Sequence, residues 1–338
     1  MNGSLLMLGL AGPELTPAET VLFSQLQPAG FVLLARNFVS AEQTRRLTDS
    51  LRKLSHRHPL IATAPDGGGL PAGLPPPAAL AAHGNAKATG TTGLLTGDLL
   101  RMLGINLLLA PTLDLDHFPE APDGRAGRRW GRDPQRVIDH AGQWNRWLRK
   151  RGVASCAKHF PGGGRALEEP NHERSASPAT VEELLREDLL PYTALMPELD
   201  AIMTSHLEFA NLDPGLPASL STRVVRRLLR DQLGFDHHLV LTDDLDHAAI
   251  TRRVSRGPDA RLALEAGNDL ALICQHPQTA PAAVEAIRTL PTQVLAEAWE
   301  RVERMRDKLH WPLPWAAAKW EESMAKLALP AAEVPEAT

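Results

Sequence analysis

The sequence predicts a single-domain (β/α)8 barrel of the TIM type with a helical extension at its C-terminus. Three observations lead to this fold class. Eight short apolar runs recur along the chain, most of them are continuous rather than alternating, and amphipathic stretches with helical spacing lie between them. Continuous apolar runs are typical of strands buried on both faces of a parallel sheet. Eight such strands alternating with helices favour a closed barrel over an open, doubly wound sheet.

The apolar runs have the length of strands. In chain order they cover residues 3–10, 29–35, 59–64, 105–111, 153–157, 200–206, 239–245 and 269–274. Several of the stretches between them follow Ser, Thr or Asp-Pro and end at Gly, as capped helices do. The clearest helical stretches are residues 41–54, 134–152, 180–196 and 222–234.

Two long loops interrupt this alternation. A Gly- and Pro-rich loop covers residues 65–79 and a polar loop covers residues 116–134. Both follow predicted strands, so we expect both at the C-terminal face of the barrel, where such barrels build their active sites. Residues 292–327 are expected to be helical. These assignments predict one domain over residues 1–327 and a disordered tail at 328–338.

The composition is that of an ordinary globular protein and excludes some partners. Of the 338 residues, 43% are hydrophobic and 22% are charged, which is enough apolar material for a large core. The net charge of -4 gives no electrostatic footprint for nucleic acid or for an anionic membrane. The N-terminus lacks the charged start of a secretory signal, and no run reaches the roughly 18 apolar residues of a membrane span. We therefore expect neither nucleic acid nor a membrane as a partner, and we expect a monomer.

The cysteine and histidine patterns argue against a disulfide or a metal centre. Cys156 and Cys274 each lie inside an apolar run, which indicates buried, reduced thiols and a cytoplasmic location. The histidine-rich segment at 236–247 resembles a set of metal ligands. However, His237 and Asp243 would lie about 20 Å apart along a strand, too far to share one ion. We expect neither a metal nor an organic cofactor.

Charged and polar side chains gather where the predicted strands stop. Asp114 follows the fourth strand, Lys158 and His159 end the fifth, His206 ends the sixth and Asp243 ends the seventh. In a barrel these strand ends meet on one face, so we expect a functional site there. For His206, a contact with substrate and a purely structural role are equally open.

These residue types suit glycoside hydrolysis. A carboxylate fixed at a strand end, such as Asp243, can act as a nucleophile. A loop histidine such as His172 can protonate a leaving group and then activate water, because the ordinary pKa of histidine, about 6.5, allows both states. Glu169 lies close enough in sequence to orient the ring of His172, and Lys158 and His159 would donate to sugar hydroxyls.

At these residues the sequence resembles glycoside hydrolase family 3, and within it the single-domain bacterial β-N-acetylglucosaminidases of peptidoglycan recycling. The family motif Lys-His-Phe-Pro-Gly is matched at 158–162, and its nucleophile segment is matched by GFDHHLVLTDDL at 234–245. The similarity extends over nearly the whole chain. Further matching segments are residues 33–37, 109–115, 127–134, 200–206, 217–219 and 264–274.

The resemblance implies a role for each matching residue. Asp243 would form a glycosyl-enzyme, His172 would be the acid/base with Glu169 as its partner, and Arg129, Lys158 and His159 would bind N-acetylglucosamine. The implied reaction is the release of a nonreducing-end β-N-acetylglucosamine with retention, without a cofactor. The implied substrate is a GlcNAc-1,6-anhydroMurNAc fragment in the cytoplasm.

Two segments differ from the family pattern. Where the family's third strand ends in Asp-Gln-Glu-Gly-Gly-Arg, this chain has Ala64 in place of the sugar-binding Asp, and Asp66 is the candidate substitute contact. In the catalytic loop Pro170 stands two residues before His172, where the family has Asp, so Glu169 is expected to take that part.

Two functions of different classes therefore stay open. The first is a retaining exo-β-N-acetylglucosaminidase. The second is a degenerate family member that has lost or altered sugar hydrolysis and acts as a binding or regulatory protein. The retained Asp243 and His172 favour the enzyme. Phosphorolysis is a further alternative within the enzyme class, because a histidine acid/base repels an incoming phosphate less than a carboxylate would.

Overall fold

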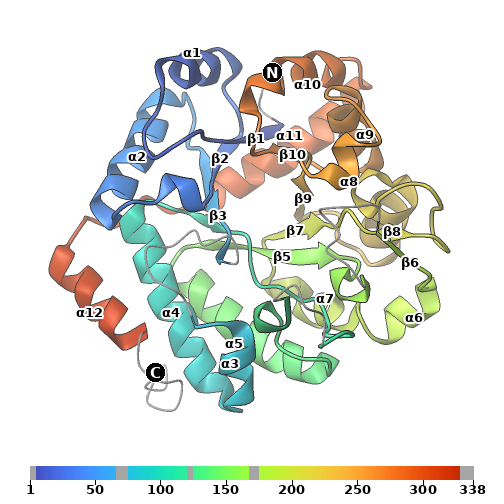
Figure 1. The fold of residues 1–338 in the computed structure, drawn as a ribbon, viewed down its shortest axis with the longest axis horizontal. Helices are drawn as coiled ribbons and strands as arrows, with labels where there is room; N and C mark the ends of the chain where they lie inside the picture. The colour runs from blue at the N-terminus through green and yellow to red at the C-terminus, as the bar shows by residue number, and fades with distance from the viewer. Residues whose placement is uncertain (1–4, 66–74, 120–124, 167–174, 328–338) are drawn as a thin grey trace.

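Eight parallel strands close into a barrel that is surrounded by helices (Figure 1). The structure is a computed structural model that describes residues 5–65, 75–119, 125–166 and 175–327. The barrel strands are β1 (Leu6–Gly9), β2 (Gly30–Leu33), β3 (Leu60–Thr63), β4 (Leu107–Leu108), β5 (Ala154–Phe160), β7 (Ala201–Thr204), β9 (Leu239–Asp244) and β10 (Leu270–Ile273). Each strand overlaps one of the eight apolar runs, and the predicted (β/α)8 fold is confirmed.

The barrel closes where its first and last strands meet. β1 pairs in parallel with β10, with Leu6 opposite Ala271. At the active-site end of this seam, Arg36 donates hydrogen bonds to the carbonyls of Leu10 (2.7 Å) and Cys274 (2.6 Å). One guanidinium therefore ties the segment after β2 to the ends of both seam strands.

A second, two-stranded sheet lies outside the barrel, and the apolar pattern does not predict it. It pairs β6 (Ala176–Ser177) in parallel with β8 (Glu208–Phe209). Both strands are two residues long and lie at the periphery of the ribbon in Figure 1, beyond β5 and β7. They belong to the segments that follow β5 and β7, so they help to fix the loops on that side of the barrel.

Helices cover the outside of the barrel. They are α1 (Pro17–Leu26), α2 (Ala41–Leu54), α3 (Pro77–Ala82), α4 (Ala86–Leu103), α5 (Pro134–Lys150), α6 (Val181–Arg186), α7 (Leu190–Leu195), a π-helical segment (Arg223–Gln232), α8 (Ala248–Thr251), α9 (Pro258–Ala266), α10 (Ala280–Ile287), α11 (Thr292–Lys308) and α12 (Ala317–Leu327). The helix predicted at 41–54 is confirmed, and its N-terminus is capped by the hydroxyl of Ser40.

Two predicted helices are each divided in two. The stretch 180–196 forms α6 and α7, and α7 restarts with a proline in its first turn, where the missing N–H costs no hydrogen bond. The C-terminal extension over 292–327 forms α11 and α12. The segment between them contains Pro312 and Pro314, and a proline cannot continue a helix without losing a backbone hydrogen bond.

Helix α4 packs closely on α5 because it has glycines on the facing side. A Cβ atom placed on Gly93 would collide with the backbone carbonyl of Trp144, and one on Gly97 would meet the side chain of Arg151. The same glycines lower the intrinsic helix propensity of the segment. Packing against α5 therefore compensates for a sequence that by itself disfavours a helix.

The two cysteines are free and buried, as predicted. Cys156 lies in β5 and Cys274 directly follows β10. Among the helices in the described ranges, none combines the length and the apolarity that crossing a membrane requires.

Candidate active site

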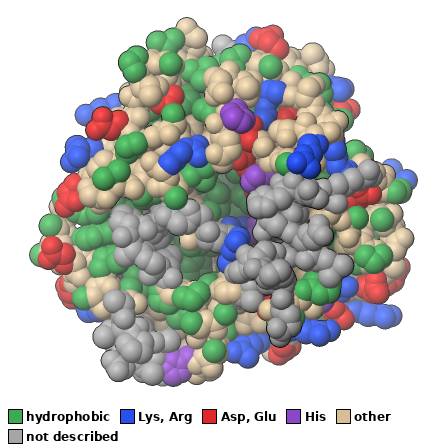
Figure 2. All heavy atoms as spheres, viewed as in Figure 1, with side chains coloured by type: hydrophobic (Ala, Val, Ile, Leu, Met, Phe, Trp, Pro, Cys, Tyr) green, Lys and Arg blue, Asp and Glu red, His purple; other side chains and the backbone are tan. Residues whose placement is uncertain are grey.

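A cavity of about 210 Å³ lies at the C-terminal ends of the barrel strands. Figure 2 shows the hollow near the centre of the face, with hydrophobic and basic side chains visible inside it. Residues at or just after the ends of β2, β3, β5, β7, β9 and β10 line it, together with the segment after β4. Of the strand-end residues predicted to form a site, Asp114, Lys158, His159 and Asp243 are brought together in this pocket, and His206 does not line it.

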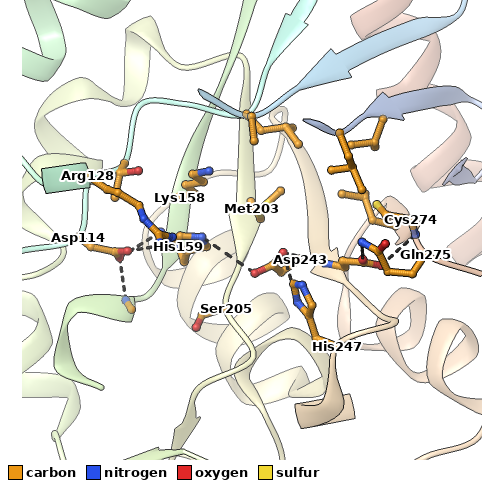
Figure 3. Close-up of a pocket in the computed structure, with 18 of the residues that line it drawn as sticks. Asp114, Arg128, Lys158, His159, Met203, Ser205, Asp243, His247, Cys274 and Gln275 are labelled. Carbon is orange, nitrogen blue, oxygen red and sulfur yellow. Dashed lines mark hydrogen bonds and ion pairs between the residues drawn. The ribbon is translucent and has the colours of Figure 1, made fainter. Parts of the chain in front are cut away.

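His159 is held in place by Asp114. The Asp114 carboxylate lies 2.7 Å from Nδ1 of His159 and also accepts the backbone N–H groups of His159 (3.1 Å) and Gly163 (2.8 Å). An ionised carboxylate can only accept, so Nδ1 carries a proton and Nε2 is turned toward the pocket (Figure 3). Both oxygens of Asp114 are thus taken up by these hydrogen bonds. The role of Asp114 is to position His159.

The pKa directions of this pair favour a charged imidazole. Burial by itself would raise the pKa of Asp114, but the charge and hydrogen bonds of His159, with the charge of Arg129, lower it below its ordinary value. Burial by itself would lower the pKa of His159, but the charge and hydrogen bond of Asp114 raise it. Both shifts favour the protonated ring, whose Nε2–H would be a donor facing the pocket.

Asp243, the last but one residue of β9, lies between two histidines (Figure 3). Its Oδ1 accepts the backbone N–H of Asp244 at 2.7 Å and lies 3.8 Å from Nδ1 of His247. Its Oδ2 receives no hydrogen bond from the described residues, and Nε2 of His159 is 4.0 Å away. One oxygen is thus fixed by the backbone and the other is open to the pocket.

The same carboxyl is kept ionised. Burial by itself would raise the pKa of Asp243, but the charges of His247, His206 and His159 lower it well below its ordinary value. A buried, ionised carboxylate with an unengaged oxygen is what a nucleophile requires.

The neighbouring Asp244 has a different role. Its Oδ1 accepts the backbone N–H of Cys274 (2.9 Å) and of Asp246 (3.1 Å), and its Oδ2 accepts from the side chain of Gln275 (3.3 Å). Burial raises its pKa. Asp244 therefore joins β9 to β10, and of the two consecutive aspartates Asp243 is the one left open for chemistry.

Three basic side chains line the pocket besides the histidines. Lys158 and Arg129 are each only 3% exposed, and Arg129 donates to Asp116 at 3.0 Å. Arg128 also lines the pocket and reaches an adjoining cavity of about 280 Å³ that is rich in proline and tryptophan. Within the described ranges the side chain of Arg128 has no hydrogen bond or ion pair. The motif resemblance indicates Arg129 and not Arg128, because nothing in two consecutive arginines shows which guanidinium is left unpaired in the cavity.

His206 lies behind the pocket and is fully engaged. Its Nε2 donates to the carbonyl of Asp244 (2.9 Å), so its Nδ1 accepts the hydroxyl of Ser219 (2.8 Å). Burial lowers the pKa of His206 to about 4. Of the two roles left open by the sequence, this geometry favours the structural one.

Within the part of the chain that the structure describes, two groups of side chains come close enough together to share a metal ion. One is His206, Asp243 and His247, and the other is His117, Glu187 and Asp188. Both ring nitrogens of His206 are already engaged. In the second group, Arg165 donates to Asp188 (2.6 Å) and to Glu187 (2.9 Å). Neither group offers a complete set of unengaged ligand atoms.

Three predicted site residues lie outside the described residues. They are the candidate acid/base His172, its proposed partner Glu169 and the candidate sugar contact Asp66. Their roles stay predictions from the sequence.

Comparison with known proteins identifies the family. The sequence pattern of the Glycosyl hydrolase family 3 N terminal domain matches residues 7–305. The chain belongs to glycosyl hydrolase family 3. The resemblance predicted from the Lys-His-Phe-Pro-Gly and Thr-Asp-Asp-Leu motifs is thereby confirmed.

Individual family 3 relatives match most of the chain. A β-hexosaminidase of Alkalilimnicola ehrlichii is 34% identical over 299 residues, which cover 85% of this chain and 84% of the relative. The structure of a family 3 β-N-acetylglucosaminidase from Paenibacillus sp. str. FPU-7 superposes with a TM-score of 0.87 at 28% identity, over 96% of this chain and 67% of that one. Native NagZ from Neisseria gonorrhoeae superposes with a TM-score of 0.81 at 25% identity, over 99% of both chains.

Proposed function

We propose that this family 3 protein is a retaining exo-β-N-acetylglucosaminidase that works through a covalent glycosyl-enzyme. The observation that carries the proposal is Asp243, an ionised carboxylate with one fixed oxygen and one oxygen open to a pocket. The names of its relatives support the class of substrate. The Alkalilimnicola ehrlichii relative is a β-hexosaminidase, and NagZ from Neisseria gonorrhoeae has been solved in complex with N-trifluoroacetyl-D-glucosamine.

The reaction would proceed in two displacements. Oδ2 of Asp243 attacks the anomeric carbon while the bond from that carbon to the leaving oxygen breaks, and the leaving oxygen takes a proton from the acid/base. Water then attacks the same carbon, gives its proton to the acid/base and releases Asp243 as a carboxylate. We assign the acid/base role to His172 with Glu169 on the sequence motif alone.

The sugar would be held by donors on one side of the pocket. The charged His159, Lys158 and Arg128 all line the cavity and can donate to hydroxyl or acetamido oxygens. Arg129 lines it as well but is already paired with Asp116. Asp114 would act through His159 rather than by touching the sugar.

The finer parts of the proposal follow from the motif resemblance. We propose that the substrate is a GlcNAc-1,6-anhydroMurNAc fragment, that hydrolysis takes place in the cytoplasm and that the protein acts as a monomer. We also propose that residues 1–327 form one catalytic domain. The predicted disordered tail at 328–338 lies outside the described residues.

The decisive experiment measures chromophore release from a nitrophenyl β-N-acetylglucosaminide and from the matching β-glucoside, with and without phosphate. We expect the wild type to cleave the amino sugar, and we expect Asp243→Ala to lower kcat/KM by at least about a thousandfold because the nucleophile is lost. Asp231→Ala, at an exposed aspartate of the Arg223–Gln232 segment, is the matched control and should retain full activity.

Other outcomes would change the proposal in defined ways. Equal activity of Asp243→Ala and the wild type would refute the assigned nucleophile. Release that depends on phosphate and yields a sugar phosphate would replace hydrolysis by phosphorolysis. Sugar binding without release from any aryl glycoside would favour the binding protein.

A further inference from the structure

A second histidine, His247, lies beside the carboxylate of Asp243, and neither step of the reaction proposed above uses it. His247 follows β9 and precedes α8, and its ring lines the pocket (Figure 3). Its Nδ1 is 3.8 Å from Oδ1 of Asp243, and this nitrogen is buried without a hydrogen-bond partner. The ring packs edge-on against His206, with centroids 5.8 Å apart.

The surroundings leave Asp243 as the natural partner of this nitrogen. Among the described residues, the charged and titratable groups that face His247 are Asp243 and Asp244 on β9 and His206 after β7. His206 is engaged on both nitrogens, and Asp244 accepts from the segment after β10. On its own segment, Asp246 is paired with Arg256.

The position of His247 is on the side of Asp243 away from the attacking oxygen. Oδ1 is held by the N–H of Asp244 and faces His247, whereas Oδ2 faces His159 across the pocket. About 27% of the His247 side chain is exposed, so the ring can exchange a proton with solvent in the pocket while Nδ1 faces the carboxylate.

We propose that His247 is a positioning residue whose protonation sets the balance between attachment of the sugar to Asp243 and its release. This inference rests on the proposed function. His247 gives no proton to the sugar. It gains or loses one from solvent, and its charge acts on the carboxylate beside it.

The reason is the opposite change of charge in the two steps. Attachment converts the Asp243 carboxylate into a neutral ester, so a positive charge 3.8 Å away opposes it. Release restores the carboxylate, so the same charge favours it. A protonated His247 therefore slows the first displacement and speeds the second, and a neutral His247 does the reverse.

The test follows both steps with a dinitrophenyl β-N-acetylglucosaminide between pH 5.5 and 8. With so good a leaving group, release of the sugar limits kcat, while kcat/KM reports attachment. At pH 5.5 we expect His247→Gln to lower kcat by about tenfold relative to wild type and to lower KM by more than that, because release is slower and attachment is faster. The fraction of glycosyl-enzyme seen by rapid quench and intact mass should increase. The difference between the two proteins should shrink as the pH is raised from 5.5 to 8.

A second variant keeps the inference open to refutation if the first is unstable. His247→Lys carries a positive charge over the whole pH range of the test. The kinetic behaviour that the wild type shows at pH 5.5 should therefore persist up to pH 8 in this variant. His237→Gln is the matched control, because it makes the same replacement at an exposed histidine before the opposite end of β9. Melting temperatures of all three variants report folding.

The outcomes separate this inference from the proposed function. If the wild type forms no glycosyl-enzyme and releases no chromophore, the proposed function fails and this inference fails with it. If the wild type is active but His247→Gln accumulates no more glycosyl-enzyme than the wild type at pH 5.5, only this inference is overturned. An equal loss in kcat and kcat/KM at every pH would indicate a merely structural histidine and would also overturn it.

Discussion

The two sides of the pocket have different chemistry. The ends of β5 and β9 carry Lys158, His159 and Asp243, each buried or part-buried and fixed by the strands. The ends of β2 and β3 contribute only apolar described residues, namely Val32, Leu34 and Ala64. The first side is equipped to break a glycosidic bond, whereas the described residues of the second offer no charged group to a sugar hydroxyl. We infer that the rate of chemistry and the affinity for sugar are set by opposite sides of this pocket.

The largest effect is expected on the reactive side, at the residue that positions His159. In Asp114→Asn an amide faces Nδ1 of His159 and disfavours the charged ring, much as a wrong tautomer disables a catalytic triad. We expect kcat/KM for a nitrophenyl β-N-acetylglucosaminide to fall by about a hundredfold. Asp116→Asn, two residues further on, should cost less than about threefold. Equal losses in the two variants would contradict the division of roles.

The next largest effect should come from adding a charge to the apolar side. Ala64→Asp places a carboxylate at the end of β3, where it can accept from two sugar hydroxyls. A hydrogen bond to a charged group is worth about 1.5–3 kcal/mol, so KM should fall by at least about tenfold with little change in kcat. Ala64→Leu, the apolar control, should raise KM. A folded Ala64→Asp protein with unchanged KM would show that the sugar does not reach β3.

A smaller effect is expected where the two consecutive arginines differ. Arg128→Met removes a cation without a described partner and should raise KM by about fivefold without loss of stability. Arg129→Met breaks the pair with Asp116 and should lower the melting temperature as well as the activity. Parallel measurement of KM and melting temperature distinguishes the two. The reverse pattern would place Arg129, as the sequence alone suggests, at the sugar.

The smallest effect is a pH-dependent difference in stability between wild type and Asp114→Asn. The folded-state pKa of His159 is raised, so its contribution is present below the unfolded value and is lost as pH rises through the folded value. The pKa of Asp114 is lowered, so its contribution is lost only as pH falls through that lower value. The gap in unfolding free energy should therefore be widest between about pH 5 and 6 and narrow toward pH 9. A gap that widens toward pH 9 in urea melts would contradict the ion pair.

The strands were predictable because burial on both faces leaves a direct trace in the sequence. Each barrel strand overlaps a run of apolar residues, and such a run can be recognised without knowing which other segments pack against it. Helix α4 left no such trace, since its glycines make sense only against Trp144 and Arg151 of the following helix region. The prolines that divide two of the predicted helices, Pro191 and Pro312, are visible in the sequence. Their effect on the helices, however, depends on how the chain returns to the barrel.

The same distinction applies to the site. Asp243, Lys158 and His159 could be located because each stands at the end of an apolar run. The pairing of His159 with Asp114 joins residues 45 positions apart and depends on how β4 lies beside β5. His247 gave no signal of its own among the other histidines near β9. The role proposed for His247 follows from the turn after β9, which brings its ring back toward Asp243.

The pairing of β1 with β10 affects how the protein folds while it is being synthesised. Leu6 of β1 lies opposite Ala271 of β10, and Arg36 donates to the carbonyl of Cys274 as well as to that of Leu10, so the barrel cannot close until nearly the whole chain has left the ribosome. Until then the emerging strands carry open, apolar edges that invite aggregation. Contacts between such distant parts of a sequence also slow folding. The cell must therefore keep the incomplete, unpaired sheet from aggregating for most of the time that the chain is being synthesised.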